Sequence, residues 1–242
     1  MEKQKRIWEI DAARGIAVAM MFISNFALDL VFFAGYHIDI TSGFWLYFAR
    51  TTAFLFVFVA GISLALSFAR QERKAFGKYL IRGLRIFGYG LLITFVTLVL
   101  FPQSPIFFGI LHLIGLSIIL GYMFLRSEKI ALISGFLIVA AGLYLDGVSL
   151  DAPWLLWTGL SYEGFTSFDY TPVFPWFGFF LIGIFFGKTV YAGGASRLRH
   201  ARESFRPLNI ITWMGRNSLF LYLVHQPVFV GFIMLFLWGA GY

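Results

Sequence analysis

Long apolar runs are the feature that most constrains this chain. Several continue for roughly 18 residues or more, enough for a helix to cross a hydrocarbon layer about 30 Å thick. The 242 residues are 60% apolar and their mean hydropathy is +0.81, whereas soluble domains are about 45–50% apolar. Helices satisfy their own backbone hydrogen bonds in lipid, and the alternating pattern of barrel strands is absent from the sequence. The sequence therefore predicts an all-α, polytopic membrane protein.

Seven membrane-spanning helices are expected. Their ranges are 13–34, 44–69, 79–101, 106–125, 130–146, 173–191 and 216–238. All but one of the 19 Lys and Arg residues fall before the first helix, in alternate connections or in the helix ends beside them, and such charge collects on the cytoplasmic side. We therefore expect a single domain over residues 1–242, multi-pass in the cell membrane, with its N-terminus inside and its C-terminus outside.

The charge and the cysteine count exclude several functions. The net charge of +7 follows the helix ends, so it is assigned to topology and no nucleic-acid partner is expected. The chain has no cysteine, which excludes disulfides, a thiol nucleophile and cysteine-based metal sites. We expect no bound metal.

Polar residues interrupt the apolar pattern at related depths. The candidates in the predicted outer half of the membrane, or in the loop above it, are Asn25, Asp29, His37, Arg50, His112 and His225. At 1.5 Å per residue, Asp29 and Arg50 lie at nearly the same level, roughly 8 Å below the outer surface. Charges there are costly and usually have a partner or a task. We interpret these residues as the lining of a shared polar chamber.

Each of these residues also has a purely structural interpretation. Asp29 and Arg50 can form an ion pair that serves stability alone, and His112 can be a core histidine bonded to a carbonyl. His225 can satisfy backbone groups that the nearby proline leaves open. His37 can be an ordinary exposed loop residue.

A second group of candidates lies at the predicted cytoplasmic helix ends. Its members are Arg14, Arg82, Arg85, Arg216, Asn217 and Ser218. The stretch GRNS, residues 215–218, is expected to place backbone N–H groups and an arginine at a helix N-terminus, which attracts anions. Together these residues are expected to hold a phosphate-bearing ligand, although topology alone also explains the arginines. His200, in the basic stretch RLRHARESFR, is expected to be solvated.

Five stretches resemble a known family in the same order along the chain. They are RIWEIDAARGIAVAMMFISNFALDL, FLFVFVAGISLALSFAR, FGILHLIGLSIIL, FPWFGFFLIGIFFGK and GRNSLFLYLVHQPV. They resemble the heparan-alpha-glucosaminide N-acetyltransferase catalytic-domain family, a class of transmembrane acyltransferases. The resemblance implies transfer of an acetyl group from cytoplasmic acetyl-CoA to an amine or hydroxyl, typically of a sugar, at the outer side.

The resemblance also implies roles for individual residues. Many prokaryotic relatives carry His where this chain has Asn25, the eleventh residue after the arginine that matches Arg14. The lysosomal branch has Asn there and a functional His in the next outer loop, which His37 matches in place. We therefore predict His37 as the base or covalent acyl carrier and Asn25 as the oxyanion donor. Asp29 is expected to orient a histidine or to pair with Arg50.

Several alternatives stay open at this point. His112 is the rival base, and both direct transfer and an acyl-histidine route are consistent with the sequence. A proton-coupled or small-solute transporter is the alternative function, because polar residues within the membrane also suit proton relays. A structural or interaction protein is a third class. Expected partners are acetyl-CoA, the sugar acceptor and the bilayer, and a homodimer is left open.

Overall fold

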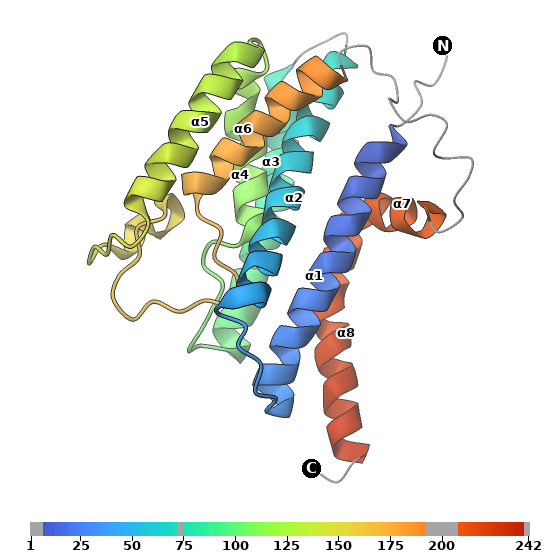
Figure 1. Cartoon of the computed structure of the whole chain (residues 1–242), viewed down its shortest axis with the longest axis vertical. Helices are drawn as coiled ribbons and strands as arrows, with labels where there is room; N and C mark the ends of the chain where they lie inside the picture. Colours follow the sequence, from blue (N-terminus) through green and yellow to red (C-terminus); the bar gives the residue numbers. More distant parts are fainter. Residues whose placement is uncertain (1–6, 72–74, 192–207, 240–242) are drawn as a thin grey trace. The chain divides into compact units, whose positions relative to one another are not determined.

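The computed structural model describes residues 7–71, 75–191 and 208–239, and it confirms the all-α prediction (Figure 1). The helices are α1 (Trp8–Ala34), α2 (Gly43–Ala69), α3 (Phe76–Leu100), α4 (Ile110–Gly121), α5 (Glu128–Leu145), α6 (Val173–Val190), α7 (Leu208–Arg216) and α8 (Ser218–Gly239). Two 3-10 helices are η1 (Tyr122–Phe124) and η2 (Pro153–Thr158). The described residues hold no β-strand beyond an isolated bridge between Ser149 and Ser161.

The membrane spans follow the predicted ranges closely. Within the described residues, six helices are long and apolar enough to cross a membrane, and the apolar stretch Ile110–Phe124 is shorter. That stretch was expected to begin at residue 106, but Gly109 is extended and α4 starts after it. Helix α7 was not expected. The chain is therefore a multi-pass membrane protein, while the inside–outside orientation stays a prediction.

The chain divides into two compact units. The first comprises residues 1–56 and 196–242, and the second comprises residues 57–195, so the boundary falls within α2. The prediction of one domain stays a prediction.

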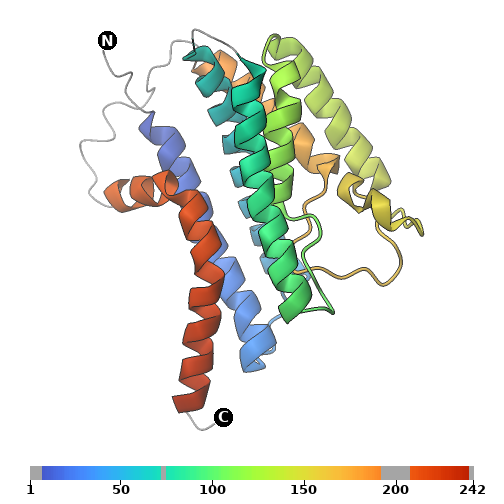
Figure 2. The same cartoon turned by 180° about the vertical axis from the view of Figure 1, so that it is seen from behind.

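In the first unit, α1 packs against both α7 and α8. Helices α1 and α8 run side by side in the same direction, and α7 crosses α1 near its start (Figures 1 and 2). The crossing depends on two glycines. A Cβ atom at Gly15 would collide with the carbonyl of Ile211, and one at Gly215 would collide with the carbonyl of Asp11. Small residues let helix backbones approach closely where lipid supplies no hydrophobic driving force.

In the second unit, the same device joins several pairs of helices. Gly135 on α5 meets Gly178 on α6, and Gly83 on α3 meets Gly115 on α4, each so closely that a Cβ would contact the facing backbone. Gly183 on α6 lies in the same way against the backbone of α2. These contacts place the core of the second unit on α2, α4 and α6, where the side chains are most completely buried.

The loop between α5 and α6 packs over one end of the second unit. The Tyr170 hydroxyl donates to the carbonyl of Leu156 in η2 (2.8 Å), and burial raises the pKa of Tyr170 to about 12. Asp169 accepts from the backbone N–H of Ile110 (2.9 Å). An acidic side chain at this helix N-terminus is favourable, so the loop helps to fix where α4 begins.

Candidate functional site

The closest meeting of predicted site residues is between Asn25 on α1 and His225 on α8. Asn25 Nδ2 lies 2.8 Å from His225 Nε2. Asn25 is half-buried and His225 is buried. The two residues are 200 positions apart in sequence, so their contact is a product of the packing of α1 on α8. Polar groups that meet inside a membrane protein commonly mark a functional pathway.

The other ring nitrogen decides which tautomer of His225 fits this site. Nδ1 lies 2.6 Å from the backbone carbonyl of Tyr222, and a carbonyl oxygen can only accept. Nδ1 therefore carries the proton, and in the neutral ring Nε2 presents a lone pair to the Asn25 amide. The carbonyl that Pro227 deprives of its helical donor belongs to Leu223, four residues earlier. The hydrogen bond from His225 Nδ1 to the Tyr222 carbonyl therefore does not serve the carbonyl that Pro227 leaves open.

Aromatic rings surround the His225 imidazole. Phe22 stacks on it with a centroid distance of 5.8 Å, and Phe229 meets it edge-on at 5.8 Å. Tyr222 lies 5.6 Å away with its ring tilted. These rings exclude water and restrict the imidazole, which strengthens hydrogen bonds at its polar edge.

Asp29 lies one helical turn beyond Asn25 and bonds to the residue that follows His225. Its Oδ1 accepts from the side-chain amide of Gln226. Asp29 is only 1% exposed, and its Oδ2 has no hydrogen-bond partner among the described residues. Arg50 is exposed on α2, and no ion pair joins it to Asp29 in the described part of the chain. The partner that packing gives Asp29 is therefore Gln226, which sequence reasoning missed.

A charged cluster lies at the opposite end of α1. Asp11 is buried and accepts from Arg216 Nε (3.2 Å), while Arg14 lies 3.9 Å from the other carboxylate oxygen. Arg14 also donates to the carbonyl of Gly215 (3.3 Å). Two guanidinium groups thus approach one carboxylate. Asp11 was missed, although its spacing of three residues from Arg14 is typical of a pair on one helix face.

The GRNS stretch is organised differently from the expectation. Arg216 ends α7, and α8 begins at Ser218 rather than at 216. The backbone N–H of Asn217 is used by the carbonyls of Trp213 and Met214. Arg216 therefore sits at a helix C-terminus, which suits a cation, and the free amides of α8 start only after Asn217.

His37 lies in the loop between α1 and α2. It is exposed, and Gly35 ends α1 just before it with a positive φ of 68°. Asp39 then accepts from both the hydroxyls and the backbone N–H groups of Thr41 and Ser42. The Ser42 hydroxyl, followed by Thr41, holds the pKa of the Asp39 carboxyl below its ordinary value. The loop thus has internal order that places His37 at the surface.

His112, the rival base, occupies a structural position in the second unit. The backbone N–H of Gly109 donates to its Nδ1 (3.2 Å), which caps the start of α4. Nε2 lies 3.3 Å from Thr94 Oγ1, whose own proton goes to the carbonyl of Ile106 (2.6 Å). His112 Nε2 is therefore the donor in that contact. Both ring nitrogens are occupied and the side chain is buried, which favours the core interpretation.

The remaining candidates are not brought together by contacts within a unit. Arg82 and Arg85 are exposed on α3 in the second unit, slightly less than one turn further into the helix than expected because α3 begins at Phe76. His200 lies outside the described residues. No group of three or more His, Cys, Asp or Glu side chains within the described ranges is arranged to hold a metal, and the expectation of no metal stays a prediction.

A comparison with protein families shows to which family the chain belongs. The model of the family described as "Heparan-alpha-glucosaminide N-acetyltransferase, catalytic" matches residues 6–227. The chain belongs to this family. No curated protein and no solved structure matches it. The matched range includes α1 and the start of α8 as far as Pro227, so both members of the Asn25–His225 pair lie within it. Membership supports a transmembrane acetyltransferase and confirms the resemblance seen in the sequence.

Proposed function

We propose that this chain transfers an acetyl group from cytoplasmic acetyl-CoA to an amine or hydroxyl, of a sugar, at the outer side of the membrane. The observation that carries the proposal is the contact between Asn25 and His225. The two groups are suited to acyl transfer and lie on membrane-spanning helices of a chain that belongs to an acetyltransferase family. An amide can donate to a developing oxyanion, and a neutral imidazole can accept a proton.

The tautomer of His225 supports a role as the base. Its Nδ1–H is held by the Tyr222 carbonyl, so Nε2 is the basic atom. When an acceptor N–H or O–H replaces Asn25 at Nε2, the proton passes to the ring while the acceptor atom attacks the thioester carbon. The Asn25 amide is then released to donate to the thioester oxygen. The C–S bond breaks, and the CoA thiolate takes the proton from the imidazolium, which restores the neutral His225 ring.

His37 remains the second candidate base, as the resemblance implies. Its exposed position in the loop after α1 suits a residue that meets an acceptor arriving from outside. His112 is assigned a structural role in this scheme, because Nδ1 accepts from the backbone at the start of α4 and Nε2 is bonded to Thr94 on α3. The variants His225→Phe and His37→Ala distinguish the two candidate bases.

The donor is proposed to bind at the end of α1 that the charge pattern predicts to be cytoplasmic. Arg14 and Arg216 place two guanidinium groups there, and Asn217 and Ser218 contribute the start of α8. Arg14 and Asn25 are about 16 Å apart along the helix at 1.5 Å per residue, which an extended pantetheine arm can span. Arg82 and Arg85 stay predictions for the same phosphates.

The test combines acetyl-CoA binding with acetyl transfer to glucosamine in proteoliposomes. Loss of an oxyanion donor costs about 2.7–4 kcal/mol of barrier, so Asn25→Ala should lose a hundredfold or more in turnover and still bind acetyl-CoA. His225→Phe should lose turnover similarly. Ser24→Ala is the matched control, because among the described residues the Ser24 hydroxyl bonds only to the Met21 carbonyl on its own helix.

Three outcomes would change the proposal. Full activity in His225→Phe together with an inactive His37→Ala variant would move the base to His37. Unchanged acetyl-CoA affinity in Ala variants of Arg14 and Arg216 would place the donor elsewhere. A wild-type protein that neither binds acetyl-CoA nor acetylates any amine or hydroxyl would favour the transporter alternative.

A further inference from the structure

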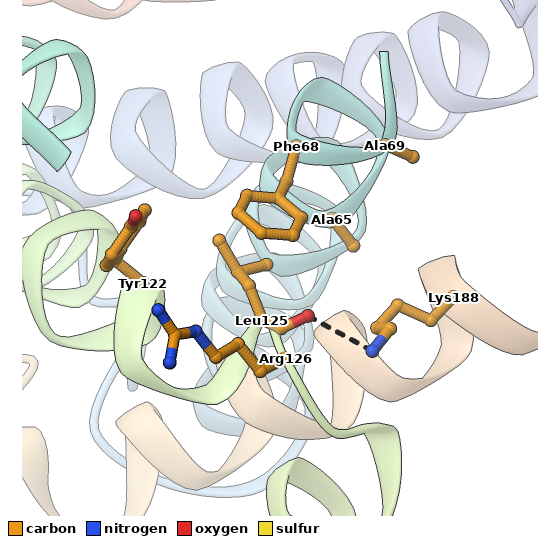
Figure 3. A pocket seen from close by; sticks show the side chains of 7 residues that line it. All are labelled: Ala65, Phe68, Ala69, Tyr122, Leu125, Arg126 and Lys188. Carbon is orange, nitrogen blue, oxygen red and sulfur yellow. Dashed lines mark hydrogen bonds between the residues drawn. The ribbon is translucent and has the colours of Figure 1, made fainter. Parts of the chain in front are cut away.

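A cavity of about 420 Å³ lies in the second unit, where the end of α2, η1 and the end of α6 meet (Figure 3). The last turn of α2 and the start of α5 lie at this same end, which the charge pattern predicts to be cytoplasmic. Arg126 and Ala69, both in the lining, are exposed, so the cavity opens at the surface. None of the residues proposed above for acetyl transfer lines it.

One part of the cavity wall is apolar. Ala65, Phe68 and Ala69 come from the last turns of α2, and Tyr122 comes from η1. The rings of Phe68 and Tyr122 meet edge-on with centroids 6.0 Å apart. This surface offers contact area to hydrocarbon or glycerol groups and offers little to a small hydrated ion.

The other part of the wall carries two cations with different surroundings. Lys188 Nζ donates to the carbonyl of Leu125 (3.1 Å) and pairs with Glu128 at 3.1 Å, so its charge is largely compensated. Arg126 follows η1 and has no hydrogen-bond or ion-pair partner among the described residues. Figure 3 shows its guanidinium directed to the side of the cavity where Tyr122 lies. The uncompensated charge of the cavity therefore belongs to Arg126.

We propose that this cavity binds the phosphate of an anionic phospholipid headgroup. Arg126 pairs with the phosphate oxygens, since a guanidinium forms two parallel hydrogen bonds to such a group. Phe68 and the two alanines contact the glycerol and the first methylene groups of the acyl chains. Basic pockets between membrane helices on the cytoplasmic side are typical sites for anionic headgroups, and the position at the ends of spanning helices matches headgroup depth.

The test measures which lipids stay bound to the purified full-length protein by native mass spectrometry, with phosphatidylglycerol and phosphatidylcholine offered together. The wild type should retain phosphatidylglycerol preferentially. Arg126→Gln should reduce that preference roughly tenfold or more, the effect of losing a charged hydrogen bond. Ala69→Leu should reduce it without any change of charge, because the larger side chain fills the cavity.

Lys129→Gln is the matched control. Lys129 is exposed in the first turn of α5, it does not line the cavity, and its loss removes the same charge. An equal fall in Lys129→Gln and Arg126→Gln would show diffuse surface attraction and overturn the proposal. Equal retention of both lipids by the wild type would do the same. Displacement of the lipid by inorganic phosphate or by CoA, each offered alone at matched concentration, would assign the site to a soluble phosphate instead.

Discussion

The contact between Asp29 and Gln226 allows a sharp stability experiment. Asp29 is 1% exposed, Gln226 supplies the single hydrogen bond to Oδ1, and Oδ2 has no partner among the described residues. Gln226→Met keeps the shape of the side chain but leaves the buried carboxyl with neither oxygen bonded. Stranding a buried polar group costs about 1–3 kcal/mol, and more if it is charged.

Replacing both partners should recover most of that loss. Substitution of a hydrogen-bonded pair by apolar groups of similar shape is nearly neutral, so Asp29→Leu with Gln226→Met should be more stable than Gln226→Met alone. The resulting coupling of about 1–3 kcal/mol is the signature of direct contact. Arg50→Leu is the comparison, because the sequence predicted Arg50 as the partner. It should show no coupling to Asp29, since Arg50 is exposed and unpaired with Asp29 in the described residues.

The assay is thermal unfolding in detergent, followed by tryptophan fluorescence for the single and double variants. In a chain of this length, each kcal/mol shifts the midpoint by roughly 2–4 °C. An unchanged midpoint in Gln226→Met would refute the reasoning. Rescue of the Asp29 variant by Arg50→Leu would instead support the ion pair expected from the sequence.

Three further predictions follow from other parts of the chain. Gly215→Ala should destabilise the protein by about 1–3 kcal/mol, because the added Cβ overpacks against the Asp11 carbonyl. Gly231→Ala is the control: no atom lies within 4 Å of its added Cβ, so it should be neutral or stabilising in the same thermal assay. Equal unfolding midpoints for the two variants would contradict the α1–α7 contact. The pKa of Tyr170 is raised to about 12. Its contribution to the free energy of unfolding is therefore complete below the ordinary pKa of about 10 and is lost as the pH rises through 12. Unfolding measured across an alkaline pH series should show this loss of stability in the wild type but not in Tyr170→Phe. A cysteine placed at Asp151 should react with an impermeant reagent from outside, and labelling only from the cytoplasm would reverse the predicted topology.

The sequence by itself determined the helices and their approximate ends. The length of a hydrophobic run compared with the bilayer leaves few alternatives, so the expected ranges and the observed helices agree to within a few residues at most ends. It also identified Asn25, Asp29 and His225 as unusual, because a polar residue in such a run is conspicuous whatever it contacts. Short elements were missed: α7 has nine residues, too few to produce an apolar run.

The tertiary structure decided which side chains meet. Periodicity shows that Asn25 and Asp29 share a face of α1, but it does not show which helix that face meets. The partner is set by where helices approach, and here α1 is held against α7 through Gly15 and Gly215 and runs beside α8. For that reason Asn25 bonds to His225, and Asp29 bonds to Gln226 rather than to Arg50. These contacts join residues about 200 positions apart, and hydropathy along one chain carries no record of them.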